Sequence, residues 1–240
     1  MLMRRLRDQD GMTLPEMLVA ISMALIVSLA TFSLIEFTMR RSGEISGRVD
    51  ANQRGRVAME TITRQLRSQV CQPSGTPPIF SRAGNATDGN GVTFFVDFTD
   101  GSQAATTPVD MHTIRYVPPT APAVAGTIVE QDYTGTLGAN PSIDPSYSAT
   151  PYRTRTLLTD VVPVSPGAPI FSYYQYNSTA PLATPVTGPA LSSITSVQIA
   201  YRALPSRSTT TTARGNVVFQ DLVTVREVDP NTPNPAPLCA

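Results

Sequence analysis

The feature that most constrains this chain is an uninterrupted apolar run near its start. From Met17 to Ile35 the sequence reads MLVAISMALIVSLATFSLI, nineteen residues of which none is ionisable. A helix of this length spans about 28 Å at about 1.5 Å per residue, which is close to the hydrocarbon thickness of a bilayer. The run therefore predicts one membrane-spanning helix.

The charges on either side of the run predict its orientation. Arg4, Arg5 and Arg7 precede it, and basic flanks stay on the cytoplasmic side of a membrane. We therefore expect a single-pass protein of the cytoplasmic (inner) membrane, with its N-terminus in the cytoplasm. The chain from Glu36 onward would lie outside, in the periplasm or, once assembled in a filament, outside the cell.

Two ordinary interpretations leave part of the opening segment unexplained. A secretory signal peptide has a shorter apolar region that ends in small residues; SLA at Ser28 to Ala30 would serve, but the apolar run continues past it. A plain signal anchor accounts for the arginines and the length but not for Glu16. A carboxylate costs roughly 2–3 kcal/mol near the centre of a membrane helix and less near its end.

The stretch GMTLPE, followed by the apolar run, resembles the class III signal of type IV prepilins and pseudopilins. In that family a membrane aspartic peptidase cuts after a leader glycine and methylates the new N-terminal amine, and a glutamate occupies the fifth mature position. The resemblance makes Gly11 the last leader residue, Met12 the first and N-methylated mature residue, and Glu16 the fifth. Met12 stands where the family often has Phe. Pro15 suits a first helical turn, where its missing N–H has no intrahelical partner.

The resemblance also implies a role for Glu16 and a set of partners. In the family, this carboxylate pairs with the N-terminal amine of a neighbouring subunit, and an ion pair is stronger in low dielectric than in water. Glu16 would then determine assembly. The implied partners are the prepilin peptidase, other pilins or pseudopilins, an inner-membrane assembly platform and membrane lipid. The formal net charge is zero, so composition gives no reason to require nucleic acid.

The helical pattern continues beyond the membrane run, and we expect one long helix from about Leu14 to about Val70. Apolar residues recur at steps of three or four, which is typical of an amphipathic helix: Ile45, Val49, Met59, Ile62, Leu66 and Val70. Three glycines, Gly43, Gly47 and Gly55, each weaken a helix by about 1 kcal/mol relative to Ala, so the helix should be loosest there. Residues 53–67 are also similar to this segment in minor pilins of the PilW and GspJ kind.

Prolines after the helix mark a change to short β-type runs separated by loops rich in Pro, Gly, Ser and Thr. Strands are predicted at residues 92–98, 113–117, 127–133, 170–176, 194–203 and 217–227, with long loops at 134–151 and 178–189. The sequence thus predicts an α+β fold in which a long N-terminal helix packs on an antiparallel β-sheet domain, as in pilins. The expected divisions are a cleaved leader (1–11), a transmembrane and assembly half-helix (12–36), an amphipathic half-helix (37–72) and an extracytoplasmic β-rich domain (73–240).

The two cysteines, Cys71 and Cys239, form a predicted disulfide if the soluble part is exported. Such a bridge would attach the C-terminus to the base of the helix and would stabilise the fold by up to about 5 kcal/mol. The alternative is two free buried thiols.

The sequence carries little that indicates catalytic chemistry. His112 is the only histidine, no nucleophile motif accompanies it, and we interpret it as a strand-edge residue. DGNG at Asp88 to Gly91 lacks the spacing of a calcium loop and is better explained as a turn before a strand, and the tyrosines of YYQY (173–176) as sheet packing. We therefore expect no enzyme, no catalytic residue, no cofactor and no metal ligand.

These observations predict a minor pilin or pseudopilin, a non-enzymatic structural subunit of a type IV pilus, a type II secretion pseudopilus or a competence-like filament. The alternative is a single-pass, membrane-anchored extracytoplasmic binding protein or adhesin that does not polymerise. A third interpretation is a secreted hydrolase, which predicts cleavage near Ala30 and an activity that depends on His112.

Overall fold

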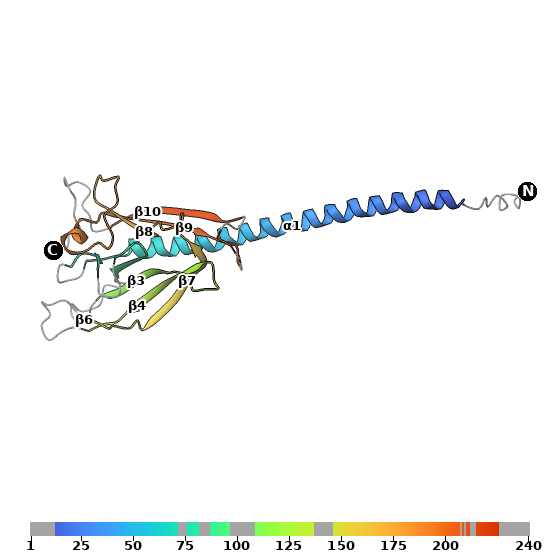
Figure 1. Cartoon of the computed structure of the whole chain (residues 1–240). Coiled ribbons are helices and arrows are strands. Elements are labelled where there is room, and N and C mark those ends of the chain that lie inside the picture. Colours follow the sequence, from blue (N-terminus) through green and yellow to red (C-terminus); the bar gives the residue numbers. More distant parts are fainter. Residues whose placement is uncertain are drawn as a thin grey trace, which may run out of the picture. The chain divides into compact units, whose positions relative to one another are not determined.

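The computed structural model describes residues 13–71, 76–81, 87–96, 109–136, 146–206, 208, 210–211 and 215–225. These residues form two compact units, of which the first ends at Ser46 and the second begins at Gly47. The boundary falls inside one uninterrupted α-helix, α1 (Leu14–Arg67), which is shown in Figure 1. The predicted long helix is confirmed, and it continues through the glycine-containing segment without a break.

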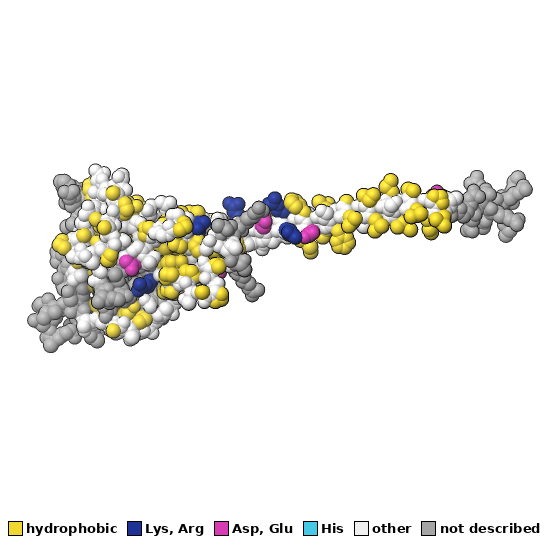
Figure 2. Space-filling model, viewed as in Figure 1, with side chains coloured by type: hydrophobic (Ala, Val, Ile, Leu, Met, Phe, Trp, Pro, Cys, Tyr) yellow, Lys and Arg dark blue, Asp and Glu magenta, His cyan; other side chains and the backbone are white. Residues whose placement is uncertain are grey.

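The first unit consists of the apolar part of α1. The helix begins after Thr13, whose carbonyl accepts hydrogen bonds from the backbone N–H groups of Glu16 (3.0 Å) and Met17 (3.1 Å). Its large apolar side chains, yellow along the helix in Figure 2, are 48–78% exposed from Leu14 to Met39. The few hydroxyl groups bond to carbonyls one turn back, as Ser28 does to Ala24 (2.7 Å). Within the described residues this is one helix that is long and apolar enough to cross a membrane.

The second unit is built on an eight-stranded, fully antiparallel sheet with the strand order β1-β2-β3-β4-β7-β9-β10, in which β8 also pairs with β9. The strands are β1 (Ile79–Phe80), β2 (Gly91–Val96), β3 (Asp110–Val117), β4 (Gly126–Tyr133), β7 (Arg153–Val162), β8 (Phe171–Tyr174), β9 (Ser196–Ala203) and β10 (Val217–Thr224). A small hairpin, β5 (Gly135–Thr136) with β6 (Ser146–Tyr147), and a 3₁₀ turn, η1 (Gly188–Ser193), complete it. The predicted α+β class is confirmed.

Six predicted strands correspond to β2, β3, β4, β8, β9 and β10, and the main omission is β7. Its sequence, RTRTLLTDVV, begins with alternating Arg and Thr and offers few apolar residues to a pattern search. β7 nevertheless lies inside the sheet, between β4 and β9. The predicted loop at 134–151 also contains the hairpin strands β5 and β6. The predicted ends of two strands, at residues 97–98 and 226–227, lie outside the described residues.

The C-terminal half of α1 is enclosed by the sheet, with β3, β4 and β7 on one side of the helix and β8, β9 and β10 on the other (Figure 1). Its buried stripe agrees with the predicted one in part. Ile62 and Leu66 are buried as predicted, whereas Ile45 and Val49 are 64% and 49% exposed. The helix face that enters the core also contains the small residues Ala51, Gly55 and Ala58, at the same three- and four-residue spacing.

Gly55 is buried because aromatic side chains from the sheet pack directly on the helix backbone. A Cβ atom at Gly55 would lie 2.2 Å from Cε2 of Phe219. The hydroxyl of Tyr201, which stacks with Phe219 at a ring-centroid distance of 5.5 Å, donates to the Gly55 carbonyl (2.8 Å). Gly55 therefore lets the helix approach the sheet closely, and the expectation that the helix is loosest at its glycines stays a prediction.

Candidate functional site

The predicted assembly residue, Glu16, lies in the first turn of α1 and is exposed. A carboxylate at this place interacts favourably with the partial positive charge of the helix N-terminus, a contribution of about 0.3–1 kcal/mol. The position of Glu16 at the start of an apolar helix is as expected, but helix-end electrostatics also accounts for it. The predicted processing residues, Gly11 and Met12, lie outside the described residues.

The predicted disulfide concerns the end of the same helix. Cys71 lies shortly after the last residue of α1, and its sulfur is not a free thiol. Cys239 lies outside the described residues. The pairing of these two cysteines remains a prediction.

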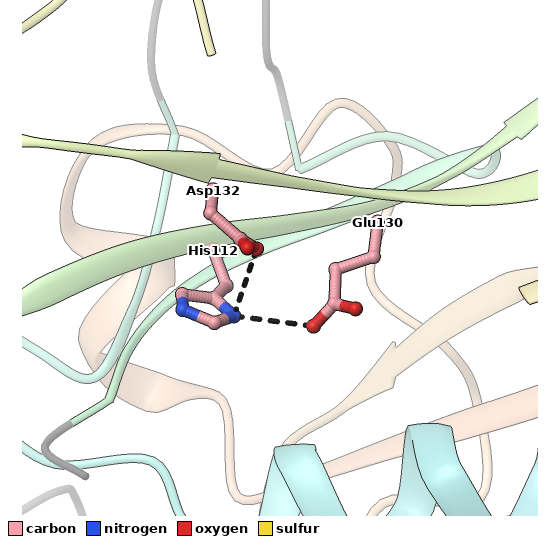
Figure 3. Close-up of side chains that lie close together, drawn as sticks. All are labelled: His112, Glu130 and Asp132. Atoms are coloured by element: carbon pink, nitrogen blue, oxygen red, sulfur yellow. Dashed lines mark hydrogen bonds and ion pairs between the residues drawn. The ribbon is translucent and has the colours of Figure 1, made fainter. Parts of the chain in front are cut away.

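A second candidate site, which the sequence did not indicate, is a buried group of three ionisable side chains on β3 and β4. His112 lies directly opposite Asp132 in the antiparallel register, and Glu130 is two residues earlier on the same face of β4. Figure 3 shows the three side chains converging on one ring nitrogen: Nδ1 of His112 is 3.3 Å from Oε1 of Glu130 and 3.3 Å from Oδ1 of Asp132. The residues are 4%, 1% and 1% exposed.

This geometry corrects one expectation about His112. It is not a strand-edge residue, because β3 lies inside the sheet between β2 and β4. Its Nδ1 and the two carboxylates also place three atoms that could bind a metal within 4.8 Å of one another.

Strand β7 and helix α1 supply the groups that surround the two carboxylates. In the antiparallel register Arg155 faces Glu130 and Arg153 faces Asp132. Nη2 of Arg155 is 2.7 Å from Oε2 of Glu130, and Nε of Arg153 is 2.7 Å from Oδ2 of Asp132. From α1, Nε2 of Gln65 donates to Oε1 of Glu130. One oxygen of each carboxylate, which we call the outer oxygen (Oε2 of Glu130 and Oδ2 of Asp132), therefore contacts an arginine. The other, inner oxygen (Oε1 of Glu130 and Oδ1 of Asp132) lies near His112.

The ionisation of Glu130 reflects opposing effects. Burial alone would raise its pKa, because desolvation disfavours the charged form. The hydrogen bond with His112 and the charge of Arg155 together outweigh burial and hold the pKa of Glu130 below its ordinary value. Glu130 is therefore a carboxylate at neutral pH, although it is almost completely buried.

The hydrogen bonding of the cluster is incomplete within the part of the chain that the structure describes. Oδ1 of Asp132 is buried and has no hydrogen-bond partner there, and the same holds for Oε1 of Gln65 and Oε1 of Gln69. Oε1 of Glu130 differs, since it accepts a hydrogen bond from Gln65 besides lying near Nδ1 of His112. Buried polar atoms without partners are costly and uncommon.

The sequence contained part of the signal for this cluster. In TIVEQDY, Ile128, Glu130 and Asp132 alternate onto one face of a strand, and Ile128 is buried. That face would have been recognised as internal only if the register with His112 and the position of β7 had been known. Neither is encoded in a local pattern.

The other motifs have structural roles. Asp88 to Gly91 forms the turn before β2, as expected, and the Gly89 carbonyl accepts from the N–H groups of Ile170 (2.7 Å) and Phe171 (3.0 Å). Tyr173 is fully buried in the core, as expected for sheet packing, and donates to the Gly91 carbonyl (2.6 Å). For Tyr176 the same expectation was wrong, because this residue lies beyond the end of β8 and is 48% exposed.

Comparison with known proteins adds no relative to these observations: no family model, no curated protein and no solved structure matches the chain. Its interpretation therefore depends on its own residues.

Proposed function

We propose that this chain is a minor pilin or pseudopilin, a non-enzymatic subunit that prepilin peptidase processes and that assembles into a type IV pilus, a type II secretion pseudopilus or a competence-like filament. The observation that carries the proposal is the exposed apolar N-terminal part of α1, with Glu16 in its first turn. The GMTLPE motif, which resembles the class III signal, places this carboxylate at the fifth position after the proposed cleavage.

The apolar half of α1 needs a cover that the rest of the described chain does not provide. Burying a large aliphatic or aromatic side chain contributes about 1.5–3 kcal/mol, and the large apolar residues from Leu14 to Met39 remain 48–78% exposed. Lipid alone would suffice for an anchor, in which a carboxylate is a cost. In a filament, the apolar helices of neighbouring subunits would replace the lipid, and the amine of a neighbour's Met12 would pair with Glu16.

The two parts of α1 suit this proposal because only the C-terminal part packs in the core of the β-rich domain. From Ala51 to Leu66 one face of the helix is committed to the core of its own domain. Up to Ser46 the helix belongs to a separate unit, and its large apolar side chains from Leu14 to Met39 are exposed. With the basic N-terminal segment in the cytoplasm, the β-rich domain would lie outside the inner membrane.

The proposal is tested by following Glu16→Ala and Glu16→Gln variants in the native host, with the sheared filament fraction and the membrane fraction measured by immunoblotting. Both variants should reach the membrane, while their content in filaments should fall by about tenfold or more, since each 1.4 kcal/mol corresponds to a factor of ten. The matched control is Glu36→Gln, which removes an exposed carboxylate that pairs with Arg40 on the same helix. Normal incorporation of Glu16→Ala would overturn the proposal.

The second candidate, a single-pass anchored binding protein or adhesin, is favoured by one observation. Glu16 already has a local explanation in the charge of the helix N-terminus. This alternative predicts that Glu16→Ala changes neither membrane level nor function, and that the mature chain keeps its N-terminal segment.

A further inference from the structure

We propose that His112, Glu130 and Asp132 form a binding site for one Zn²⁺ ion, with His112 Nδ1, Glu130 Oε1 and Asp132 Oδ1 as ligand atoms. This inference concerns the folded domain and does not depend on processing or filament assembly.

Two of the three spacings between the ligand atoms fit tetrahedral coordination. Zinc binds nitrogen at about 2.0–2.1 Å and carboxylate oxygen at about 2.0–2.2 Å, and the edges of a tetrahedron with such bonds are about 3.3–3.5 Å long. Both distances from His112 Nδ1, to Glu130 Oε1 and to Asp132 Oδ1, are 3.3 Å. An ion can therefore bridge these atoms with small side-chain adjustments.

The second observation is the buried oxygen that lacks a partner. Oδ1 of Asp132 points at His112 and has no hydrogen bond within the described residues, although Asp132 is only 1% exposed. Oε1 of Glu130 already accepts a hydrogen bond from Gln65, so the oxygen in need of a partner is Oδ1 of Asp132, which an ion bound to the Nδ1 lone pair would contact. The Oε1 atom of Gln65, also without a partner in this part of the chain, is available on a residue that contacts Glu130 and can accept a hydrogen bond from a metal-bound water.

The donor set selects the class of metal. Calcium and magnesium prefer sites made of oxygen ligands only, whereas an imidazole nitrogen with two carboxylates suits zinc. Zn²⁺ would add two positive charges to the cluster, in which Arg153 and Arg155 already pair with the two carboxylates. Arg153 and Arg155, which hold the outer oxygens, have side chains 55% and 48% exposed, so water still solvates their charge. They would act as the outer partners that orient metal-binding carboxylates.

The burial of the site points to a structural role. The side chains of the three ligands are 5%, 0% and 2% exposed, and Gln65 joins the cluster to α1. The ion would therefore fasten two central strands together beside the helix that enters the core.

The test uses the full chain without a polyhistidine tag, purified in detergent, treated with a chelator and then titrated with ZnCl₂. His112 is the only histidine, so the ¹⁵N resonances of its ring report coordination in the unmutated protein. We expect the Nδ1 resonance to shift and saturate at one equivalent. At a hundredfold excess over the dissociation constant the Tm should rise by about 5–11 °C.

The variants Asp132→Asn and His112→Asn should lose the Zn²⁺-dependent rise in Tm, while Glu60→Gln, which removes an exposed carboxylate of α1 outside the cluster, should keep it. If a variant does not fold, the ring-nitrogen titration of the unmutated chain decides. Unchanged His112 resonances at excess Zn²⁺ would overturn the proposal, as would an equal rise in Tm in Asp132→Asn.

Discussion

Substituting Gly55 by Ala tests how closely α1 approaches the sheet. At this residue a gain in helix propensity opposes a steric clash with the Phe219 ring. In an exposed helix the change stabilises by about 1 kcal/mol. Here the new Cβ would lie 2.2 Å, 2.6 Å and 2.8 Å from three atoms of the Phe219 ring. Forcing atoms into a packed core costs about 1–3 kcal/mol, so we expect Gly55→Ala to leave stability unchanged or to lower it by up to about 2 kcal/mol.

The sign of the effect should depend on Phe219. In the Phe219→Ala background the ring is gone and only the helix-propensity gain remains, so Gly55→Ala should there stabilise by about 1 kcal/mol. For a domain of this size that corresponds to a rise in Tm of about 2–4 °C. The coupling free energy between the two substitutions should therefore be about 1–3 kcal/mol.

The assay is a double-mutant cycle on the full chain in detergent, with the free energy of unfolding obtained from chemical denaturation of the β-rich domain. Gly43→Ala is the matched control, because a Cβ at Gly43 meets no atom within 4 Å, and it should not destabilise the protein. A coupling free energy near zero would refute the reasoning. It would mean that any cost of Gly55→Ala has a source other than the Phe219 ring.

Two more predictions concern Asp50 and Arg54, at the point where α1 enters the domain. Hydrogen bonds from Ser206 (2.7 Å) and then Arg54 (3.1 Å) hold the pKa of Asp50 below its ordinary 3.8, so Ser206→Ala should raise that pKa in an NMR titration. The free energy of unfolding that the variant loses should be lost in full above pH 3.8, and the difference from the unmutated chain should vanish as the pH falls through the lowered pKa. An unchanged pKa of Asp50 would contradict this. Arg54→Ala should lower the free energy of unfolding by about 1.5–3 kcal/mol, because the guanidinium donates to the carbonyls of Thr159 (3.1 Å) and Leu204 (2.9 Å). Arg54→Lys should recover only part of this loss, since an ammonium group cannot reproduce the planar geometry of the guanidinium. Full recovery of the free energy of unfolding in Arg54→Lys would count against these contacts.

The sequence predicted those parts of the fold that local patterns determine. Each of these parts depends on residues that are neighbours in the sequence. They are the apolar run of nineteen residues, the first helical turn that accepts a proline, and the strands with alternating apolar residues. The glycine-containing stripe was not recognisable, because Gly55 is buried only when Phe219, far along the chain, packs on it.

The candidate metal site could not be predicted for the same reason. Its ligands come from two strands whose register is a tertiary property. Its arginines come from β7, which the apolar pattern missed because its first half carries Arg and Thr. Charged residues on a strand normally indicate an exposed face, and Glu130 and Asp132 are exceptions because β7 supplies partners for both.

The most direct test of the central claim is the mature N-terminus, determined by mass spectrometry of the membrane fraction from the native host. The proposed processing by prepilin peptidase predicts a first peptide that begins at N-methylated Met12. An intact start at Met1 would contradict it and leave a simple anchor, and a start near Thr31 would contradict both membrane interpretations.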